Sequence, residues 1–242
     1  MLLKNFSRKN IFVILSKPSN PENIGLVARG MKNTGFKNLR LILDHPLSET
    51  AYRTAVHSKE ILRNAIIYSD LYEAVKDLEI VFAAAARHRK DFTSINFNEA
   101  VKKIMGFSSI TKIGLVFGNE RTGLVSDELR HSNFRFSIPQ KQDQPSYNLA
   151  SAVLLTLFQI FIQGSYQKKQ EEDPQLMTRK EQEECIQLII NKLEDSKFIH
   201  NTNRSHVIDM MYDLFGRLEM SHKDKRLLLA VFSKGVDERE MS

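Results

Sequence analysis

Two polar loops in the middle of the chain carry the side chains best suited to binding a ligand. The apolar run 112–117 ends at Gly118-Asn-Glu-Arg-Thr-Gly123, and the run 133–138 is followed by a second polar loop. Loops that leave the ends of adjacent strands lie together at a sheet edge, where a ligand also meets exposed backbone N–H and C=O groups. The pattern therefore indicates a binding site, with a pair of ordinary strand-to-helix connections as the alternative.

Several common kinds of site are not indicated. The segment Gly118–Gly123 has the two glycines of a Walker loop, but Leu124-Val125 replaces the Lys-Ser/Thr pair that would hold phosphates and magnesium. No G-x-G-x-x-G follows a strand, so a Rossmann dinucleotide site is not indicated. The seven His are scattered, and neither HxxxH nor a Cys/His cluster occurs, so we expect no metal.

The elements that position these loops alternate between strands and helices. Asn20-Pro21 is a helix start, and Gly35 is its C-cap. The pattern predicts strands at 11–15, 39–43, 65–68, 80–84, 112–117 and 133–138, and helices at 23–34, 48–56, 71–78, 98–105 and 149–162. This alternation indicates an α/β fold with a mostly parallel sheet and helices on both faces.

The C-terminal part differs from the rest. Behind a charged stretch at 167–175 that contains Pro174, the sequence predicts three amphipathic helices, at 176–192, 204–218 and 222–232. We therefore expect a domain at 1–166, a linker at 167–175 and a small all-helical extension at 176–242. Its basic residues suit an RNA-contacting arm, whereas the interleaved acidic residues suit a solvated face on a packing or dimerisation module.

Composition limits the class of protein. Lys and Arg total 35 against 29 Asp and Glu, a net charge of +6 that favours polyanionic partners without proving one. The single Cys185 excludes a disulfide framework and indicates a reducing, cytoplasmic environment. The longest apolar run, 149–162, is interrupted by polar residues and is shorter than the roughly 20 residues of a membrane span, so we expect no membrane association.

Three ordered segments carry a family resemblance. Residues 20–41, NPENIGLVARGMKNTGFKNLRL, resemble the first motif of the SpoU/TrmH-type branch of the SPOUT methyltransferases. Residues 115–124, LVFGNERTGL, resemble the second motif, and Ile138-Pro with 146–153, SYNLASAV, resembles the third. The match covers residues 11–166, and the tail resembles the C-terminal extension of the TrmJ group.

The resemblance implies an S-adenosylmethionine-dependent RNA 2′-O-ribose methyltransferase. Its fold would contain a C-terminal deep trefoil knot, which periodicity does not indicate and which general topology rules would exclude. The enzyme would work as a homodimer, without a metal. A tRNA is the expected substrate, at ribose 32 of the anticodon loop; an rRNA 2′-O-methyltransferase and a non-catalytic RNA-binding protein of the same fold are the alternatives.

The resemblance also implies roles for individual residues. Arg29 would act at the ribose 2′-hydroxyl, and because a guanidinium stays charged we expect it to bind the adjacent phosphate and stabilise developing alkoxide. Asn23 would meet an anion or hold the loop, with a simple N-cap as the alternative, and Glu120 would fix Arg29 or the ribose. Ser146 would organise the cofactor carboxylate or the substrate oxygen, with helix capping as the alternative.

Cofactor binding is expected from backbone and small residues after the strands. The positions that the resemblance implies are Ala84, Ala85, Ala86, Gly118, Ile138, Pro145, Ser146, Tyr147 and Asn148. The basic cluster 87–90 directly follows the alanines, and we expect Arg87, Arg89 and Lys90 to contact RNA phosphates, with a solvated loop as the alternative.

Overall fold

The chain folds around a parallel sheet, as predicted. The computed structural model describes residues 6–85, 94–141, 146–164, 176–200 and 202–234. Within them, seven strands form one sheet in the order β3-β2-β1-β6-β4-β7-β5, with parallel pairings throughout. The strands are β1 (Ile11–Ser16), β2 (Asn38–Ile42), β3 (Ile66–Tyr68), β4 (Ile80–Ala84), β5 (Ser94–Asn96), β6 (Ile113–Phe117) and β7 (Phe134–Ser137).

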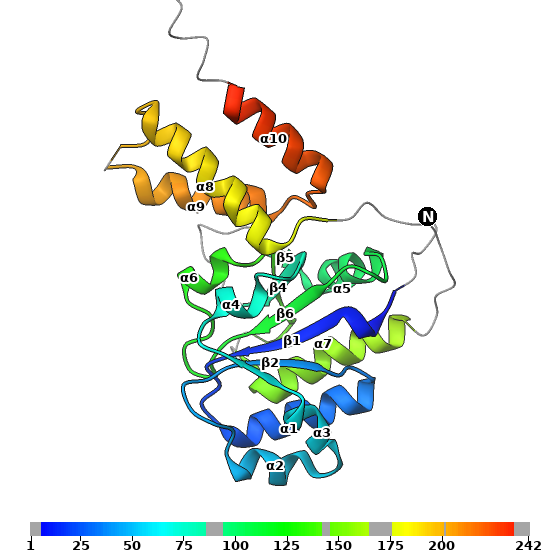
Figure 1. Ribbon diagram of the computed structural model, residues 1–242. Coiled ribbons are helices and arrows are strands. Elements are labelled where there is room, and N and C mark those ends of the chain that lie inside the picture. The colour runs from blue at the N-terminus through cyan, green and yellow to red at the C-terminus, as the bar shows by residue number, and fades with distance from the viewer. Residues whose placement is uncertain (1–5, 86–93, 142–145, 165–175, 201, 235–242) are drawn as a thin grey trace, which may run out of the picture.

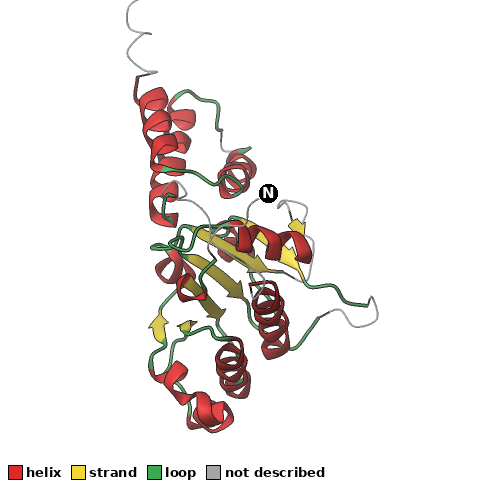
Figure 2. Cartoon of the chain, turned by 90° about the vertical axis from the view of Figure 1, so that its right-hand side faces the viewer, coloured by secondary structure: helices red, strands yellow, loops and turns green. Residues whose placement is uncertain are grey.

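Helices cover both faces of this sheet, which also confirms the prediction (Figure 1, Figure 2). One face packs against α1 (Pro21–Thr34), α5 (Phe97–Gly106) and α7 (Leu149–Gly164), and the other against α4 (Leu71–Val75) and α6 (Ser126–Arg130). In β4, Phe82 joins the first core cluster and Val81 and Ala83 join the second. A strand buried on both faces needs apolar residues at successive positions, which explains its continuous apolar run.

Three short features depart from the predictions. The edge strand β5 and the helix α3 (Lys59–Arg63) were not predicted, and α4 ends at Val75 rather than at residue 78. The strand β5 has three residues, two of them polar, and its pairing partner is β7. Such a segment has too few apolar positions to show a period. The remaining short helices are α2 (Glu49–Ala55), η1 (Arg8–Asn10) and η2 (Val56–Ser58).

Helix α1 begins at Pro21, two residues before the predicted 23–34, and ends at Thr34 as predicted. The Asn20 side chain accepts a hydrogen bond from the Glu22 backbone N–H at 2.9 Å, and Pro21 occupies the first helical turn. Gly35 ends the helix with a φ of 78°, a conformation that costs glycine little. These caps fix the start of α1 just after the carboxyl end of β1.

Three helices form the C-terminal extension, α8 (Arg179–Asp195), α9 (Arg204–Gly216) and α10 (His222–Lys234), and they share a core cluster of their own (Figure 1). Helix α8 begins later than predicted because Thr178 caps it: the Thr178 hydroxyl accepts from the Glu181 N–H, and Glu181 accepts from the Thr178 N–H. The predicted linker, 167–175, lies outside the described residues, and the domain boundaries stay a prediction.

A buried ion pair joins the extension to the sheet. Arg135 of β7 is buried, its Nη1 donates to Asp213 Oδ1 of α9 at 2.9 Å, and its Nη2 donates to the Leu129 carbonyl at 2.8 Å. Burial lowers the pKa of Arg135 to about 10, and the Asp213 carboxylate acts in the opposite direction. The extension therefore supplies the counter-charge of a cation inside the α/β part of the molecule.

We expect the substitution Asp213→Ala to lower the free energy of unfolding by about 3 kcal/mol, because it removes the carboxylate counter-charge of the buried Arg135 guanidinium. Equilibrium urea unfolding measures this loss. Adding Arg135→Met should recover part of it, since a buried methionine needs no counter-charge.

The matched control is Asp127→Ala. The Asp127 side chain is 81% exposed and pairs with Arg130 on the same helix, so its loss should change the free energy by less than about 0.5 kcal/mol. Equal effects of the two single substitutions would contradict the role of the buried pair.

Candidate functional site

A cavity of about 220 Å³ opens at the carboxyl ends of β4, β6 and β7. It lies where the two polar loops were expected to meet. Its walls are formed by residues of these strand ends, of the loops that follow them and of the start of α7: Ala84, Ala85, Phe117, Gly118, Asn119, Glu120, Arg121, Thr122, Gly123, Leu124, Leu129, Phe136, Ile138, Gln140, Ser146, Tyr147, Leu149 and Ala152.

The cavity combines an apolar interior with a polar mouth. Phe117, Leu124 and Phe136 are buried, whereas Arg121 and Tyr147 are exposed. The Tyr147 hydroxyl donates to the Pro139 carbonyl at 2.9 Å, which ties together two parts of the loop that follows β7. An apolar slot with a few polar groups at its rim suits a ligand that has a flat ring at one end and charged groups at the other, as S-adenosylmethionine does.

The turn after β6 is held by its own side chains. Asn119 Oδ1 accepts from the Arg121 N–H at 2.9 Å, and Asn119 Nδ2 donates to the Lys17 carbonyl at 2.7 Å. Gly118 allows the close approach, since a Cβ there would lie 2.4 Å from the Gly123 carbonyl carbon. The turn therefore has a fixed shape and is attached to the loop after β1.

Glu120 connects this turn to the first motif. Its carboxylate accepts from the Ser19 N–H at 2.8 Å, the Ser19 hydroxyl at 2.7 Å and the Asn20 N–H at 3.2 Å. It also accepts from Asn23 Nδ2 at 2.8 Å, and Asn23 Oδ1 accepts from Asn148 Nδ2 at 3.0 Å. A hydrogen-bonded chain, Glu120–Asn23–Asn148, thus joins all three motifs.

This network also sets the charge of Glu120. Partial burial raises the pKa of the carboxyl, but the hydrogen bonds from Ser19 and Asn23 outweigh it and lower the pKa to about 2. Glu120 is therefore ionised at neutral pH, and it acts as an acceptor rather than as a proton donor.

The predicted site residues other than Arg29 fall into three groups. Those that line the cavity are Ala84, Ala85, Gly118, Glu120, Ile138, Ser146 and Tyr147. Asn23 and Asn148 lie in the hydrogen-bonded chain rather than in the lining; Asn148 caps α7 by accepting from the Ala150 N–H at 2.9 Å, and Asn20, not Asn23, is the cap of α1. Five lie outside the described residues: Ala86, Arg87, Arg89, Lys90 and Pro145.

Arg29 is not brought to the cavity of its own chain. It is exposed on α1 and is absent from the lining, and no described residue forms a hydrogen bond or ion pair with its side chain. Within one chain Glu120 contacts Ser19, Asn20 and Asn23 rather than Arg29, and the expected role of Glu120 in fixing Arg29 or the ribose stays a prediction. Arg29 follows Asn23 by six residues, which places it more than one helical turn further along α1.

Some site residues were not predicted. Ser19 and Asn119 hold the loops, Arg121 stands at the mouth, and Phe117 and Phe136 form the apolar walls. The two phenylalanines end apolar runs and read as core residues. Asn119 and Arg121 belong to the polar turn Gly118–Gly123, and their position beside Glu120 in the sequence could have identified them.

Two other kinds of function leave no trace in the described part of the chain. No group of three or more His, Cys, Asp and Glu there is placed to hold a metal ion. None of the helices in that part is long and apolar enough to cross a membrane.

Comparison with known proteins agrees with this geometry. The model of the SpoU rRNA methylase family matches residues 10–158. The tRNA (cytidine-2′-O-)-methyltransferase TrmJ of Methanocaldococcus jannaschii is 34% identical over 183 residues, which are 70% of this chain and 79% of that protein. The tRNA (cytidine/uridine-2′-O-)-methyltransferase TrmJ of Pectobacterium atrosepticum is 27% identical over 232 residues, 93% of this chain and 95% of that protein.

A solved structure extends the likeness to the whole fold. The crystal structure of TrmJ from Z. mobilis ZM4 superposes with a TM-score of 0.78 and 26% identity, covering 91% of this chain and 96% of that chain. The chain belongs to the SpoU rRNA methylase family, whose members are knotted, S-adenosylmethionine-dependent RNA 2′-O-methyltransferases.

Proposed function

We propose that the chain methylates the ribose 2′-hydroxyl of a tRNA, at position 32 of the anticodon loop, in the cytoplasm. The TrmJ relatives support this substrate, because their similarity extends over the C-terminal helices as well as the methyltransferase part. The observation that carries the proposal is the Glu120–Asn23–Asn148 chain, which joins the first motif to the two motifs that line the cavity. A non-catalytic protein would have no need to keep that arrangement together with Arg29 and Ser146.

The cofactor would be held mainly by loop backbone. S-adenosylmethionine supplies an activated methyl group on its sulfonium. We assign its binding to Ala84, Ala85, Gly118 and Ile138 in the interior, with Ser146 and Tyr147 at the mouth. Asn148 acts indirectly in this assignment, because it caps α7. The buried apolar walls exclude water, which strengthens electrostatic interactions with the reacting oxygen.

A homodimer would bring Arg29 to a cavity. Leu26 of α1 is 41% exposed, and Leu154, Leu155 and Phe158 of α7 are 43%, 39% and 50% exposed. Leu26 lies one turn before Gly30, and a Cβ added at Gly30 would lie 3.4 Å from the Leu154 side chain. Leu26, Leu154, Leu155 and Phe158 therefore form one apolar patch. We propose that two copies pair through this patch and that Arg29, beside it, enters the site of the other copy.

In that position Arg29 would work through its charge. A guanidinium keeps its proton in proteins, so Arg29 would bind the phosphate next to the target ribose and stabilise the negative charge that develops on the 2′-oxygen, while the hydroxyl proton passes to solvent. Ser146 would orient the substrate oxygen, and Glu120 would keep the two loops in place around it.

We expect wild-type protein to transfer labelled methyl groups from S-adenosylmethionine to a tRNA fraction rather than to rRNA, with mass spectrometry locating the product at ribose 32. Arg29→Ala should slow single-turnover transfer by at least about 10²-fold, the usual cost of losing one transition-state donor. Lys32→Ala is the control, because Lys32 is another cation on α1 that pairs with Glu60. Methyl transfer to rRNA instead of tRNA would show that the proposed substrate is wrong. An Arg29→Ala variant as active as wild type would show that Arg29 has no part in the reaction.

The proposed exchange of Arg29 between subunits has its own test. The Arg29→Ala variant lacks Arg29 but keeps an open cavity. The Ala85→Phe variant keeps Arg29, but its cavity is filled by the phenylalanine. Each alone should be inactive, and mixing them should restore activity, because the mixed dimer contains one complete site. Light scattering and thermal melting check that both variants are folded dimers. If Arg29 served its own cavity, mixing would restore nothing.

The lowered pKa of Glu120 predicts a stability difference that depends on pH. Because the carboxyl pKa falls from 4.5 to about 2 on folding, its stabilisation is complete above pH 4.5 and is lost as the pH falls toward 2. Wild type should therefore melt at a higher temperature than Glu120→Gln at pH 7, and the gap should narrow on acidification. Replacing the exposed Glu22 with Gln is the control for the loss of one carboxylate. A melting-temperature difference between wild type and Glu120→Gln that stays constant with pH would contradict the role of the network.

A further inference from the structure

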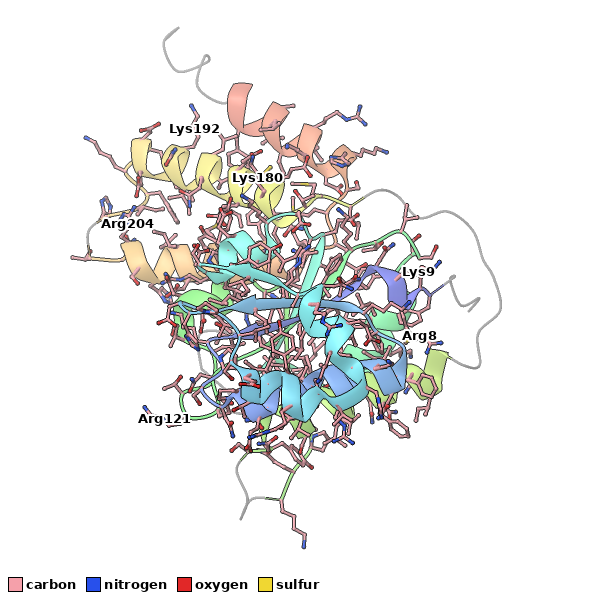
Figure 3. All side chains as sticks on the ribbon, turned by 60° about the horizontal axis from the view of Figure 1, so that its bottom comes forward. Arg8, Lys9, Arg121, Lys180, Lys192 and Arg204 are labelled. Atoms are coloured by element: carbon pink, nitrogen blue, oxygen red, sulfur yellow. The ribbon has the colours of Figure 1, made fainter. Side chains whose placement is uncertain are left out.

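Arg121 has no assigned role, although it stands at the mouth of the cavity. Its side chain is exposed and contributes to the lining, and no described residue hydrogen-bonds or ion-pairs with the guanidinium. Figure 3 shows Arg121 at the outer edge of the molecule, far from Lys9. It is therefore a cation that faces both the solvent and the site.

The backbone that carries Arg121 is held firmly. The Arg121 N–H donates to Asn119 Oδ1, and Asn119 is anchored in turn to the Lys17 carbonyl. The Gly123 N–H closes the same turn by donating to the Asn119 carbonyl at 2.8 Å. A guanidinium on a fixed turn loses less conformational freedom on binding than one on a mobile loop.

The adjacent carboxylate does not neutralise this cation. Glu120 is the neighbour in sequence, but its oxygens accept from Ser19, Asn20 and Asn23 on the side of the first motif. The network that fixes Glu120 therefore leaves the Arg121 charge available to an incoming anion.

We propose that Arg121 binds a phosphate of the RNA backbone beside the target ribose and so positions the substrate over the cavity. This inference rests on the proposed function, which supplies the RNA. A planar guanidinium matches a phosphate through two parallel hydrogen bonds, and such contacts set the register of a nucleic acid without reading its sequence. The exposed position favours an anion that arrives from solvent over the cofactor carboxylate, which shares the same chemistry.

The test compares Arg121→Ala, Arg121→Lys and Lys9→Ala. Lys9 is an exposed cation that precedes β1, whereas Arg121 follows the parallel strand β6, so the control removes one charge at the opposite end of the sheet. Filter binding of tRNA over a range of salt concentrations, calorimetric binding of S-adenosylmethionine and single-turnover methyl transfer are measured for each.

Arg121→Ala should weaken tRNA binding about tenfold and reduce the slope of log affinity against log salt by about 1, with unchanged affinity for S-adenosylmethionine. Arg121→Lys should keep the slope and recover part of the affinity, and Lys9→Ala should match wild type. Weakened cofactor binding with an unchanged salt slope would assign Arg121 to the cofactor carboxylate and overturn the proposal. If the wild-type protein modified no RNA, the proposed function would be wrong, and this inference would fail with it.

Discussion

The Glu120 carboxylate is the constraint on which the site depends. It accepts hydrogen bonds from the loop after β1 and from Asn23 of α1, and Asn23 passes the connection to Asn148 at the start of α7. The bonded residues are separated by 97 and 125 positions in sequence. An ionised carboxylate surrounded by donors is strongly held, because leaving any of them unpaired would cost more than an ordinary contact. The turn after β6, the start of α1 and the start of α7 are therefore held together.

This arrangement separates two tasks that adjacent residues perform. The Glu120 carboxylate accepts structural hydrogen bonds from Ser19, Asn20 and Asn23, while Arg121 is exposed to solvent. Asn119 shapes the turn that carries both, since it accepts from the Arg121 N–H and donates to the Lys17 carbonyl. A partly buried, hydrogen-bonded charge beside an exposed one forms the rim of the apolar cavity, without a metal ligand set in the described part of the chain.

The sequence predicted more about the elements than about their contacts. Strands buried on both faces, such as β4, produce continuous apolar runs, and the caps of α1 are local signals that residues 20–35 carry by themselves. The three-residue strand β5 has no such signal, because its existence depends on pairing with β7. At the site, motif resemblance identified Glu120 and Asn23, but not the hydrogen bond between them. Within one chain Glu120 contacts Asn23 rather than Arg29, because contacts between segments far apart in sequence follow from the tertiary fold.

The pairing of Arg135 with Asp213 has a consequence for how the protein is made. The two residues are 78 positions apart, so Asp213 is synthesised well after Arg135. At about 5–20 residues per second, the ribosome needs about 4 to 16 seconds to cover that interval. During this time Arg135 of β7 lacks the Asp213 carboxylate, so we expect its guanidinium to stay hydrated until α9 emerges from the ribosome.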